Sequence, residues 1–355
     1  MQIANAEVIP VELPLRQRVH LANQSPIDFI RVVFVRLETQ DGYNAWGCTV
    51  GEPSQGIERF EAIVRACQDG ADLAPDLHPI DLEYSLAELS PLFEDYPEAL
   101  CAFDLAFHDL LGLAAGMPLH RLLGGYRSRV QISATIPVCD VQESVEFAKK
   151  RIGQGFRMIK IKGGISPEDD VARVRAIHRA LPGMVIRLDA DGGYRVDEAL
   201  EVGRALAGKL EMLEQPTAFD DFDALRIVTS QSPIPILADQ SVSGPDSALM
   251  LTAGKYVNGL SVKIATCGGL RCSRLVDSIA RAGRLATMVN CVIEPALMSA
   301  AGLSFALSSP NVRYSDLDGF LDLLDDPTEQ SFQLAEGWLV ASDIPGLGCT
   351  VDLGR

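Results

Sequence analysis

Residues 157–164 read RMIKIKGG, and seven further segments combine a short apolar run with a polar ending in the same way. They are QISATIPV (131–138), MVIRLDADGG (184–193), LEMLEQP (210–216), PIPILADQS (233–241), GLSVKIATCGG (259–269), LATMVNCVIE (285–294) and VRYSDLDG (312–319). Short runs of this kind, bounded by Gly, Pro, Asp or Ser, are typical of buried β-strands. Segments of helix length separate them, so strands and helices are expected to alternate.

The spacing of the strand ends supports a repeated strand–helix unit. Lys162, Asp189, Glu214, Asp239 and Lys263 end five successive runs, at intervals of 27, 25, 25 and 24 residues. Each interval is about the size of one βα unit. Eight such runs predict an α/β fold with a (β/α)8-type barrel, a modified TIM barrel.

The segments on either side of the barrel have a different character. Residues 1–45 alternate apolar and polar positions, as antiparallel strands do, and Asp41-Gly42 is a hairpin-turn signal. Between residues 56 and 123 apolar positions recur three and four apart, which is the period of a helix. Strand and turn residues return after about residue 320, in SFQLAEGWLVASDIPGLGCTV.

Length and composition agree with a barrel that carries a smaller companion. The chain has 355 residues, against about 150 for an average domain, and 47% of them are hydrophobic, enough for a sizeable core. We expect an N-terminal α+β capping domain over residues 1–125 and a catalytic barrel over residues 126–320. A C-terminal segment, residues 321–355, is expected to pack back on the capping domain.

The charge balance and the cysteines limit the partners and the compartment. With 31 Lys and Arg against 48 Asp and Glu, the net charge of −17 repels polyanions, so neither nucleic acid nor a membrane is expected as a partner. The eight cysteines are scattered without a Cys-x-x-Cys pair, as reduced thiols are. We find neither a signal-peptide pattern nor a run of about 18 apolar residues, and we expect a soluble, cytoplasmic protein.

Two lysines share one face of a predicted strand. Lys160 and Lys162 alternate with Ile159 and Ile161, so the lysines point to one side and the isoleucines to the other. Active sites of such barrels lie at the carboxyl ends of the strands, and we expect both lysines in the barrel mouth. The alternative is a pair of surface lysines on an edge strand, which a closed barrel disfavours because it has no edge.

Three carboxylates end the next three strands. Asp189, Glu214 and Asp239 are expected to converge, and three such groups need a cation between them. Oxygen ligands in this number suit Mg²⁺, which keeps positions open for water and substrate, and Mn²⁺ is left open. Each acid could instead cap the helix that follows it, but three acids in register favour a metal site.

Lys263 ends the strand after the third carboxylate and would face Lys160 and Lys162 across the metal. Lysines on opposite sides of a substrate suit proton transfer at a carbon next to a carboxylate. We expect crowded positive charge to lower a lysine pKa, so that a neutral amine can act as the base.

This ordered set of residues resembles the enolase superfamily, in its muconate lactonizing enzyme subgroup, and the dipeptide epimerases of the L-Ala-D/L-Glu epimerase type. The resemblance covers the whole chain, including ALCAFDLAFHDLLGLAAGMPLHRLLGG (99–125). It implies an enolase-like barrel in which the α-proton of a metal-bound carboxylate is removed to give an enediolate. Lys162 and Lys263 would be the acid/base pair and Lys160 would stabilise the carboxylate charge. A homo-oligomer is implied as well.

Asp316 and Asp318, on the last predicted strand, direct the choice of substrate. They point to one face and resemble the Asp-x-Asp motif that binds the α-ammonium group in dipeptide epimerases, a role that charge complementarity supports. The alternative is a simple turn, because Asp318-Gly319 is a common turn pair.

Other substrate contacts are expected from the seventh strand and from a lid. Cys291 and Ile293 lie in the expected specificity region, where Cys291 is either a nucleophile or, as we favour, an unreactive buried thiol. The loop over residues 16–24, with Arg18 and His20, would be the lid that reads the substrate side chain. The chain departs from the family pattern at two positions, since Asp191 replaces the usual Asn and Gln240 a common Glu.

We therefore predict a Mg²⁺-dependent isomerase that epimerises a dipeptide, or a related amino acid derivative, by two-base 1,1-proton transfer at the α-carbon of its C-terminal residue. N-acylamino acid racemisation, o-succinylbenzoate synthesis and muconate-type cycloisomerisation on the same barrel are the alternatives. None of these substrates has an α-ammonium group to explain Asp316 and Asp318. A non-catalytic barrel retained for binding or assembly is the alternative of another class.

Overall fold

The computed structural model describes residues 1–19, 26–51 and 55–354. Its N-terminal part begins with an antiparallel sheet. Its strands are β1 (Ile3–Val19), β2 (Ile27–Thr39) and β3 (Asn44–Gly51), in that order. The predicted turn at Asp41-Gly42 joins β2 to β3, and Gly42 has a φ of +87°, which glycine adopts at little cost.

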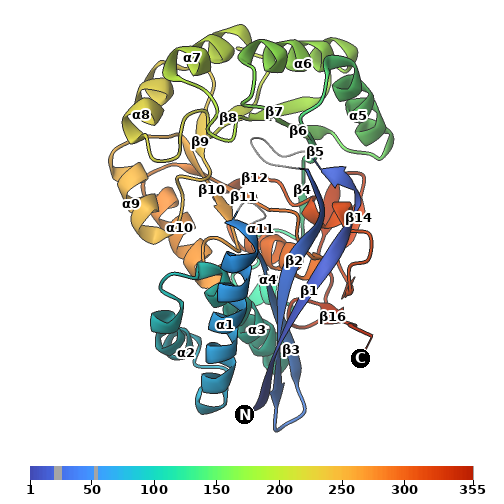
Figure 1. The fold of residues 1–355 in the computed structure, drawn as a ribbon, viewed down its shortest axis with the longest axis vertical. Coiled ribbons are helices and arrows are strands. Elements are labelled where there is room, and N and C mark those ends of the chain that lie inside the picture. The colour runs from blue at the N-terminus through green and yellow to red at the C-terminus, as the bar shows by residue number, and fades with distance from the viewer. Residues whose placement is uncertain (20–25, 52–54, 355) are drawn as a thin grey trace.

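Helices cover one face of this sheet (Figure 1). They are α1 (Gly56–Leu73), α2 (Leu82–Leu89), α3 (Pro97–Ala115) and α4 (Leu119–Leu122), with 3-10 turns η2 (Ala74–Asp76) and η3 (Ser90–Phe93). Val33 and Val35 of β2 form one apolar core with Phe103 and Phe107 of α3. The helical spacing of apolar residues in the sequence thus corresponds to helices that bury one face on the sheet.

The eight predicted strands form one parallel sheet whose order follows the chain. They are β5 (Ala134–Ile136), β6 (Met158–Lys162), β7 (Val185–Asp189), β8 (Met212–Glu214), β9 (Ile236–Ala238), β10 (Gly259–Lys263), β11 (Ala286–Asn290) and β12 (Val312–Ser315). The sheet curls until its ends meet, where the backbone N–H of Ser133 donates to the carbonyl oxygen of Ser315 at 3.2 Å. The predicted α/β barrel is confirmed.

Helices surround the strands and alternate with them, as Figure 1 shows. They are α5 (Val141–Gly153), α6 (Pro167–Ala180), α7 (Val196–Ala205), α8 (Phe222–Gln231), α9 (Pro245–Ala253), α10 (Leu270–Ala282) and α11 (Ala296–Ser308). The 3-10 helix η4 (Gly319–Asp322) takes the place of an eighth helix after β12. Ile159 and Ile161 are buried in the main apolar core, as their alternation with the lysines predicted.

The C-terminal strands connect the barrel with the N-terminal sheet and helices. They are β13 (Thr328–Gln330), β14 (Gln333–Ala335), β15 (Trp338–Val340) and β16 (Cys349–Val351). The strand β4 (Arg129–Gln131) lies earlier in the chain. β15 pairs with β4, which directly precedes the barrel. The buried carboxylate of Asp109 in α3 accepts a hydrogen bond from the backbone N–H of Leu347 at 2.7 Å. These contacts hold the N-terminal part against the barrel.

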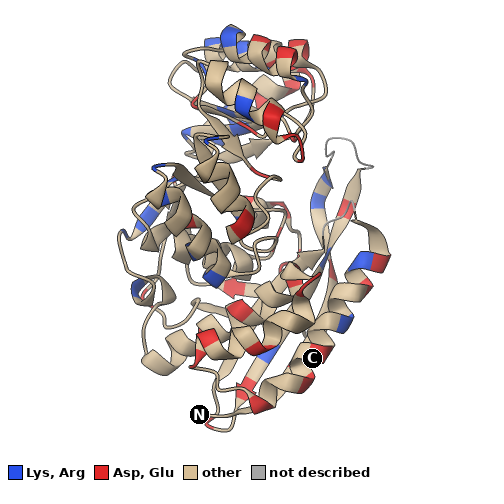
Figure 2. Ribbon diagram, turned by 90° about the vertical axis from the view of Figure 1, so that its left-hand side faces the viewer, with Lys and Arg blue, Asp and Glu red and all other residues tan. Residues whose placement is uncertain are grey.

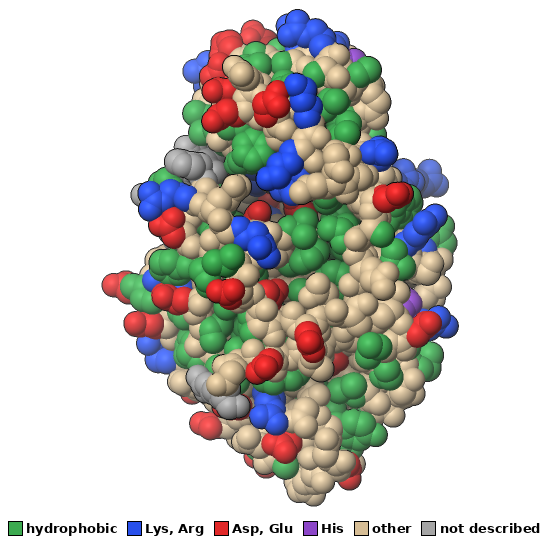
Figure 3. Space-filling view, turned by 90° about the vertical axis from the view of Figure 1, so that its right-hand side faces the viewer, with side chains coloured by type: hydrophobic (Ala, Val, Ile, Leu, Met, Phe, Trp, Pro, Cys, Tyr) green, Lys and Arg blue, Asp and Glu red, His purple; other side chains and the backbone are tan. Residues whose placement is uncertain are grey.

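The surface carries charges of both signs. Lys, Arg, Asp and Glu occur together on the outer helices in Figure 2, and acidic and basic side chains are interspersed on the face shown in Figure 3. In the part of the chain that the structure describes, no helix has both the length and the apolar character needed to cross a bilayer.

Candidate active site

A cavity of about 580 Å³ lies at the carboxyl ends of the barrel strands. The barrel contributes polar residues to its wall, among them Lys160, Lys162 and Lys263. The N-terminal sheet contributes the ends of β1, β2 and β3, which reach over the same space. The predicted site residues therefore share their cavity with residues of the N-terminal part.

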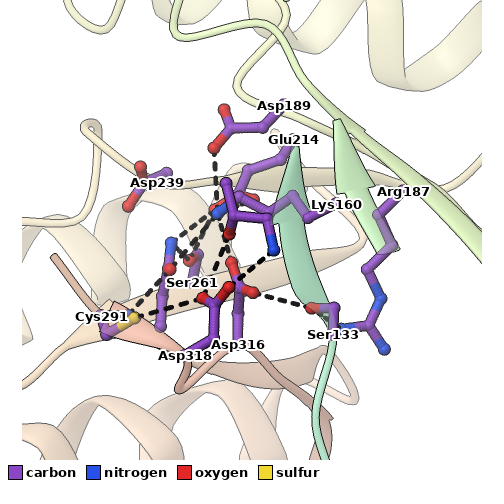
Figure 4. Close-up of polar contacts among 12 residues, drawn as sticks. Ser133, Lys160, Arg187, Asp189, Glu214, Asp239, Ser261, Cys291, Asp316 and Asp318 are labelled. Carbon is purple, nitrogen blue, oxygen red and sulfur yellow. Dashed lines mark hydrogen bonds and ion pairs between the residues drawn. The ribbon is translucent and has the colours of Figure 1, made fainter. Parts of the chain in front are cut away.

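Lys160, at the middle of β6, is buried among three carboxylates (Figure 4). Its Nζ lies 2.5 Å from Asp316 Oδ2, 3.0 Å from Asp189 Oδ2 and 3.2 Å from Glu214 Oε2. Burial lowers the pKa of Lys160, but these carboxylates outweigh it and raise the pKa well above its ordinary value. Lys160 is therefore a fixed positive charge at the floor of the cavity.

Lys162 ends the same strand and is partly exposed to the cavity. Its Nζ donates to Asp189 Oδ2 at 2.9 Å and to Asp191 Oδ1 at 3.0 Å. Gln240 Nε2 donates to the same Asp191 oxygen at 3.0 Å. The two residues that depart from the family pattern are thus hydrogen-bonded to each other, and Asp191 holds Lys162 from one side.

Lys263 lies across the cavity from Lys162, because β6 and β10 are four strands apart in a sheet of eight. Its Nζ donates to Asp239 Oδ2 at 2.7 Å. Burial lowers the pKa of both lysines, but Asp239 for Lys263, and Asp189 and Asp191 for Lys162, raise it to a larger extent. The expectation of a lowered lysine pKa is therefore wrong for the protein's own charges, since each ammonium group faces carboxylates.

Asp189, Glu214 and Asp239 converge at the ends of β7, β8 and β9, with one oxygen of each within 4.8 Å of the others. Glu214 Oε1 accepts hydrogen bonds from Ser261 Oγ at 2.8 Å and Asn290 Nδ2 at 2.9 Å. Glu214 Oε2 is buried, and no described residue donates a hydrogen bond to it, although the Lys160 ammonium group lies 3.2 Å away. This oxygen can therefore still take a metal ion as a partner.

The electrostatics of the three carboxylates also fit a metal ion. Burial and the neighbouring Asp189 raise the pKa of Glu214 to about 8, against the opposing charge of Lys160. The lysines hold the pKa of Asp189 well below its ordinary value despite its burial. A divalent cation would stabilise the ionised form of Glu214, and an all-oxygen donor set suits Mg²⁺.

Asp316 and Asp318 follow β12 and are buried at the cavity wall opposite the three carboxylates. Asp316 Oδ1 accepts from Ser133 Oγ at 2.7 Å, and its other oxygen faces Lys160. Asp318 accepts from the backbone N–H of Thr135 at 2.6 Å and from Thr135 Oγ1 at 3.1 Å. Burial and the nearby Asp316 raise the pKa of Asp318 to about 7, so a cationic group beside it would be bound favourably.

The remaining predicted residues have different fates. Cys291 and Ile293 line the cavity, and burial raises the pKa of the Cys291 thiol well above its ordinary value, which favours the unreactive alternative. Arg18 pairs with Asp28 across the hairpin at 2.6 Å, with side chains 61% and 56% exposed, and it is not among the cavity-lining residues. The pair with Asp28 leaves Arg18 exposed to solvent, and its predicted contact with the substrate stays a prediction. His20 lies outside the described residues.

Three polar residues of the site were not singled out from the sequence: Ser133, Thr135 and Ser261. A single Ser or Thr in a strand is too common to indicate a site. Ser261 had one usable signal, because it precedes Lys263 by two residues and must point to the same face.

The chain has counterparts of known activity. Residues 143–355 match the family described as enolase C-terminal domain-like. The chain is similar to the L-Lys-D/L-Arg epimerases of Desulforapulum autotrophicum (31% identity) and Methylococcus capsulatus (33% identity), each match covering 98% of this chain and 99% of the relative. Its fold is similar to the crystal structure of a dipeptide epimerase from Enterococcus faecalis V583 complexed with Mg and L-Leu-L-Tyr. That match has a TM-score of 0.94 at 26% identity and covers 99% of this chain and 100% of the other.

Proposed function

The chain belongs to the enolase superfamily, and from this premise we propose that it is a Mg²⁺-dependent isomerase that epimerises dipeptides at the α-carbon of the C-terminal residue. One observation carries the proposal: Asp316 and Asp318 line the same cavity as Lys162 and Lys263. A molecule with a carboxylate at one end and an ammonium group at the other matches the charges of this cavity.

Lys162 and Lys263 are the proposed acid and base. They lie on opposite sides of the cavity, on β6 and β10, so they can reach opposite faces of one substrate carbon. One lysine must be deprotonated first, and Mg²⁺ would favour this because its charge would offset the carboxylates that raise both lysine pKa values. The neutral amine then removes the α-proton, and the ammonium group on the other side delivers a proton. Because the new proton arrives on the opposite face, the configuration of the carbon is inverted.

Asp189, Glu214 and Asp239 are the proposed metal ligands. Mg²⁺ held by them would supply positive charge beside the substrate carboxylate, which favours loss of the neighbouring proton. Lys160 adds a further positive charge from the cavity floor. Ser261 and Asn290 hold Glu214 in place through its other oxygen.

Asp316 and Asp318 are the proposed site for the α-ammonium group. Both lie beyond β12, at the side of the barrel opposite β8, where Glu214 ends its strand. A dipeptide would therefore cross the mouth with its carboxylate toward β8 and its ammonium group toward β12. Cys291 and Ile293, after β11, border the same end of the cavity.

We propose a division of the chain in which each part has its own role. The chemistry belongs to the barrel, residues 126–320, and the cover of the site to the capping domain, residues 1–125. Residues 321–355 hold the two together through contacts such as that between Leu347 and Asp109.

The experiment that tests the proposal follows exchange of the α-proton. The protein is incubated with Mg²⁺ and pools of L,L-dipeptides in D₂O, and mass spectrometry detects the gain of one mass unit. Deuterium gain in particular dipeptides, with formation of the L,D epimer, is expected. Exchange in N-acylamino acids but in no dipeptide would overturn the proposal in favour of an N-acylamino acid racemase.

A further inference from the structure

We propose that the residue epimerised by this protein carries an apolar side chain, held against a surface that we call the apolar cover. The apolar cover consists of Val19, Ile27, Ile30 and Val50, which all line the cavity. The inference rests on the proposed function, since it names the substrate class that the same site selects.

The order of the barrel strands determines where the side chain of the reacting residue lies. The α-carbon must lie between Lys162 and Lys263, its carboxylate toward the three acids on β7 to β9 and its amide nitrogen toward the residues after β12. The floor beneath is filled by the buried Lys160. The fourth substituent, the side chain, is therefore left to point out of the barrel, toward the N-terminal sheet.

The strand ends of that sheet present apolar side chains to the cavity. Val19 ends β1, Ile27 and Ile30 open β2, and Val50 lies near the end of β3. Ile30 and Val50 are buried, and Val19 and Ile27 are partly buried. Three adjacent strands of one sheet thus each contribute apolar side chains to the cavity, and Gln17 of β1 adds a polar one.

The barrel continues this surface on the side of β8 to β10. Phe219 follows β8, Val242 follows β9 and Ala265 follows β10, and all three line the cavity. Phe219 is 59% exposed although it is a large apolar residue, so it leaves apolar surface exposed to solvent next to the site. An apolar substrate side chain between Phe219 and the apolar cover would remove this surface from water.

The apolar cover offers no charge to a substrate side chain, although charged residues line other parts of the cavity. Among the described residues that line it, the only cation besides the three lysines is Arg151, which is on α5. Among the described residues of the N-terminal part, Glu98 is the charged one that lines the cavity, and its carboxylate lies 2.9 Å from Arg59 Nη2. Asp322 on η4 is a further carboxylate of the cavity wall. The four residues of the apolar cover carry no charge, so a substrate Glu, Lys or Arg side chain held against them would lose its hydration without a counter-charge from the cover.

The first test is a substrate panel with the wild-type protein and Mg²⁺. The dipeptides L-Ala-L-Leu, L-Ala-L-Phe, L-Ala-L-Glu, L-Ala-L-Lys and L-Ala-L-Arg share an N-terminal residue and differ at the reacting one. We expect kcat/KM for the Leu and Phe dipeptides to exceed that for each charged dipeptide by roughly 10²-fold or more. Equal or faster turnover of a charged dipeptide would overturn the inference.

The second test places a cation in the apolar cover. In Ile27→Lys the ratio of kcat/KM for L-Ala-L-Leu to that for L-Ala-L-Glu should fall by roughly 10²-fold. The matched control is Phe29→Lys, because Phe29 is on the same strand, is 38% exposed and does not line the cavity. A ratio that changes equally in both variants, with folding checked by circular dichroism, would contradict a contact at Ile27.

The two proposals fail in different ways. If no dipeptide exchanges its α-proton while N-acylamino acids do, the proposed function fails. If dipeptides exchange but those with charged C-terminal residues exchange as fast as the others, the proposed function stands and the apolar cover is not the specificity determinant.

Discussion

The backbone N–H of Thr135 donates a 2.6 Å hydrogen bond to the carboxylate of Asp318. This bond joins β5, the first strand of the barrel, to the residues that follow β12, the last. A second hydrogen bond across the same junction runs from the Ser133 hydroxyl, Oγ, to the carboxylate of Asp316 at 2.7 Å. The proposed ammonium site is thus built on the seam where the barrel closes, and the seam holds both carboxylates in fixed positions.

Replacing Asp318 should separate dipeptides from N-acylated substrates. Asp318→Asn keeps an oxygen that can accept from Thr135 but removes the charge that would face the α-ammonium group. We expect kcat/KM for dipeptides to fall by roughly 10²-fold, the size of one lost charged hydrogen bond. Steady-state kinetics measure the effect, with the exposed Asp325→Asn as the control. An equal loss on N-acylamino acids would argue against the assignment.

The raised pKa of Asp318 also predicts a pH dependence. Its pKa of about 7 means that the fraction of carboxylate able to pair with an ammonium group increases as the pH rises from 5.5 to 7, while the α-amino group of a dipeptide, with an ordinary pKa of about 8, stays mostly charged. The ratio of kcat/KM in the wild type to that in Asp318→Asn should therefore increase over this range. Rate profiles of both proteins measure it, and a ratio that stays flat would show that Asp318 does not pair with the substrate.

The side chains that share a face at the end of a strand were predictable from the sequence, because successive residues of a strand point to opposite sides. The pair Lys160 and Lys162 follows from that rule alone, whereas Asp316 and Asp318 come after β12 has ended, although all four line one cavity. The cover of the site did not follow, since the orientation of Arg18 depends on its pairing with Asp28 across a hairpin. Lysine pKa values depend on which carboxylates lie within a few ångströms, and residue spacing does not give those distances.

Replacing Lys162 and replacing Lys263 should impair proton transfer in distinguishable ways. Lys162→Arg and Lys263→Arg keep a positive charge beside Asp189 and Asp239, but arginine does not deprotonate at working pH. We expect each to lower the rate of epimerisation by about 10²–10⁴-fold. Each variant should still exchange the α-proton of the one epimer that faces the remaining lysine, as followed by NMR in D₂O. Loss of exchange for the same epimer in both variants would contradict a mechanism with two bases. The control is Lys150→Arg on α5, which should not change the rate.

Binding of Mg²⁺ should stabilise the folded protein through Glu214. At a concentration 100 times its dissociation constant, a ligand that binds only the folded state adds about 2.7 kcal/mol to the free energy of unfolding. We expect the melting temperature to rise on addition of Mg²⁺ and to return on addition of a chelator. Glu214→Gln keeps the acceptor for Ser261 and Asn290 but loses a charge, so its response should be much smaller. The exposed Glu201→Gln should respond as the wild type does, and an unchanged response of Glu214→Gln would place the metal elsewhere.

Glu294, buried behind the ammonium site, should make stability depend on pH. Burial raises its pKa to about 8, and the described residues give it two hydrogen bonds, from Ser299 Oγ at 3.1 Å and from the backbone N–H of Val292 at 3.4 Å. Between pH 4.5 and 8 the folded protein keeps a proton on Glu294 that the unfolded chain has released. The free energy of unfolding of the wild type should therefore fall as the pH rises through this window, by at most about 1.4 kcal/mol per pH unit from this group.

The variant Glu294→Gln isolates this contribution, because glutamine has nothing to titrate and keeps an oxygen for Ser299. Its free energy of unfolding, measured by urea titration at pH 5, 6, 7 and 8, should fall less steeply with pH than that of the wild type. Since all other titrating groups are shared, the difference between the two proteins reports Glu294 alone. Parallel curves would mean that Glu294 is already ionised in the folded protein at pH 5, and that burial does not govern its pKa.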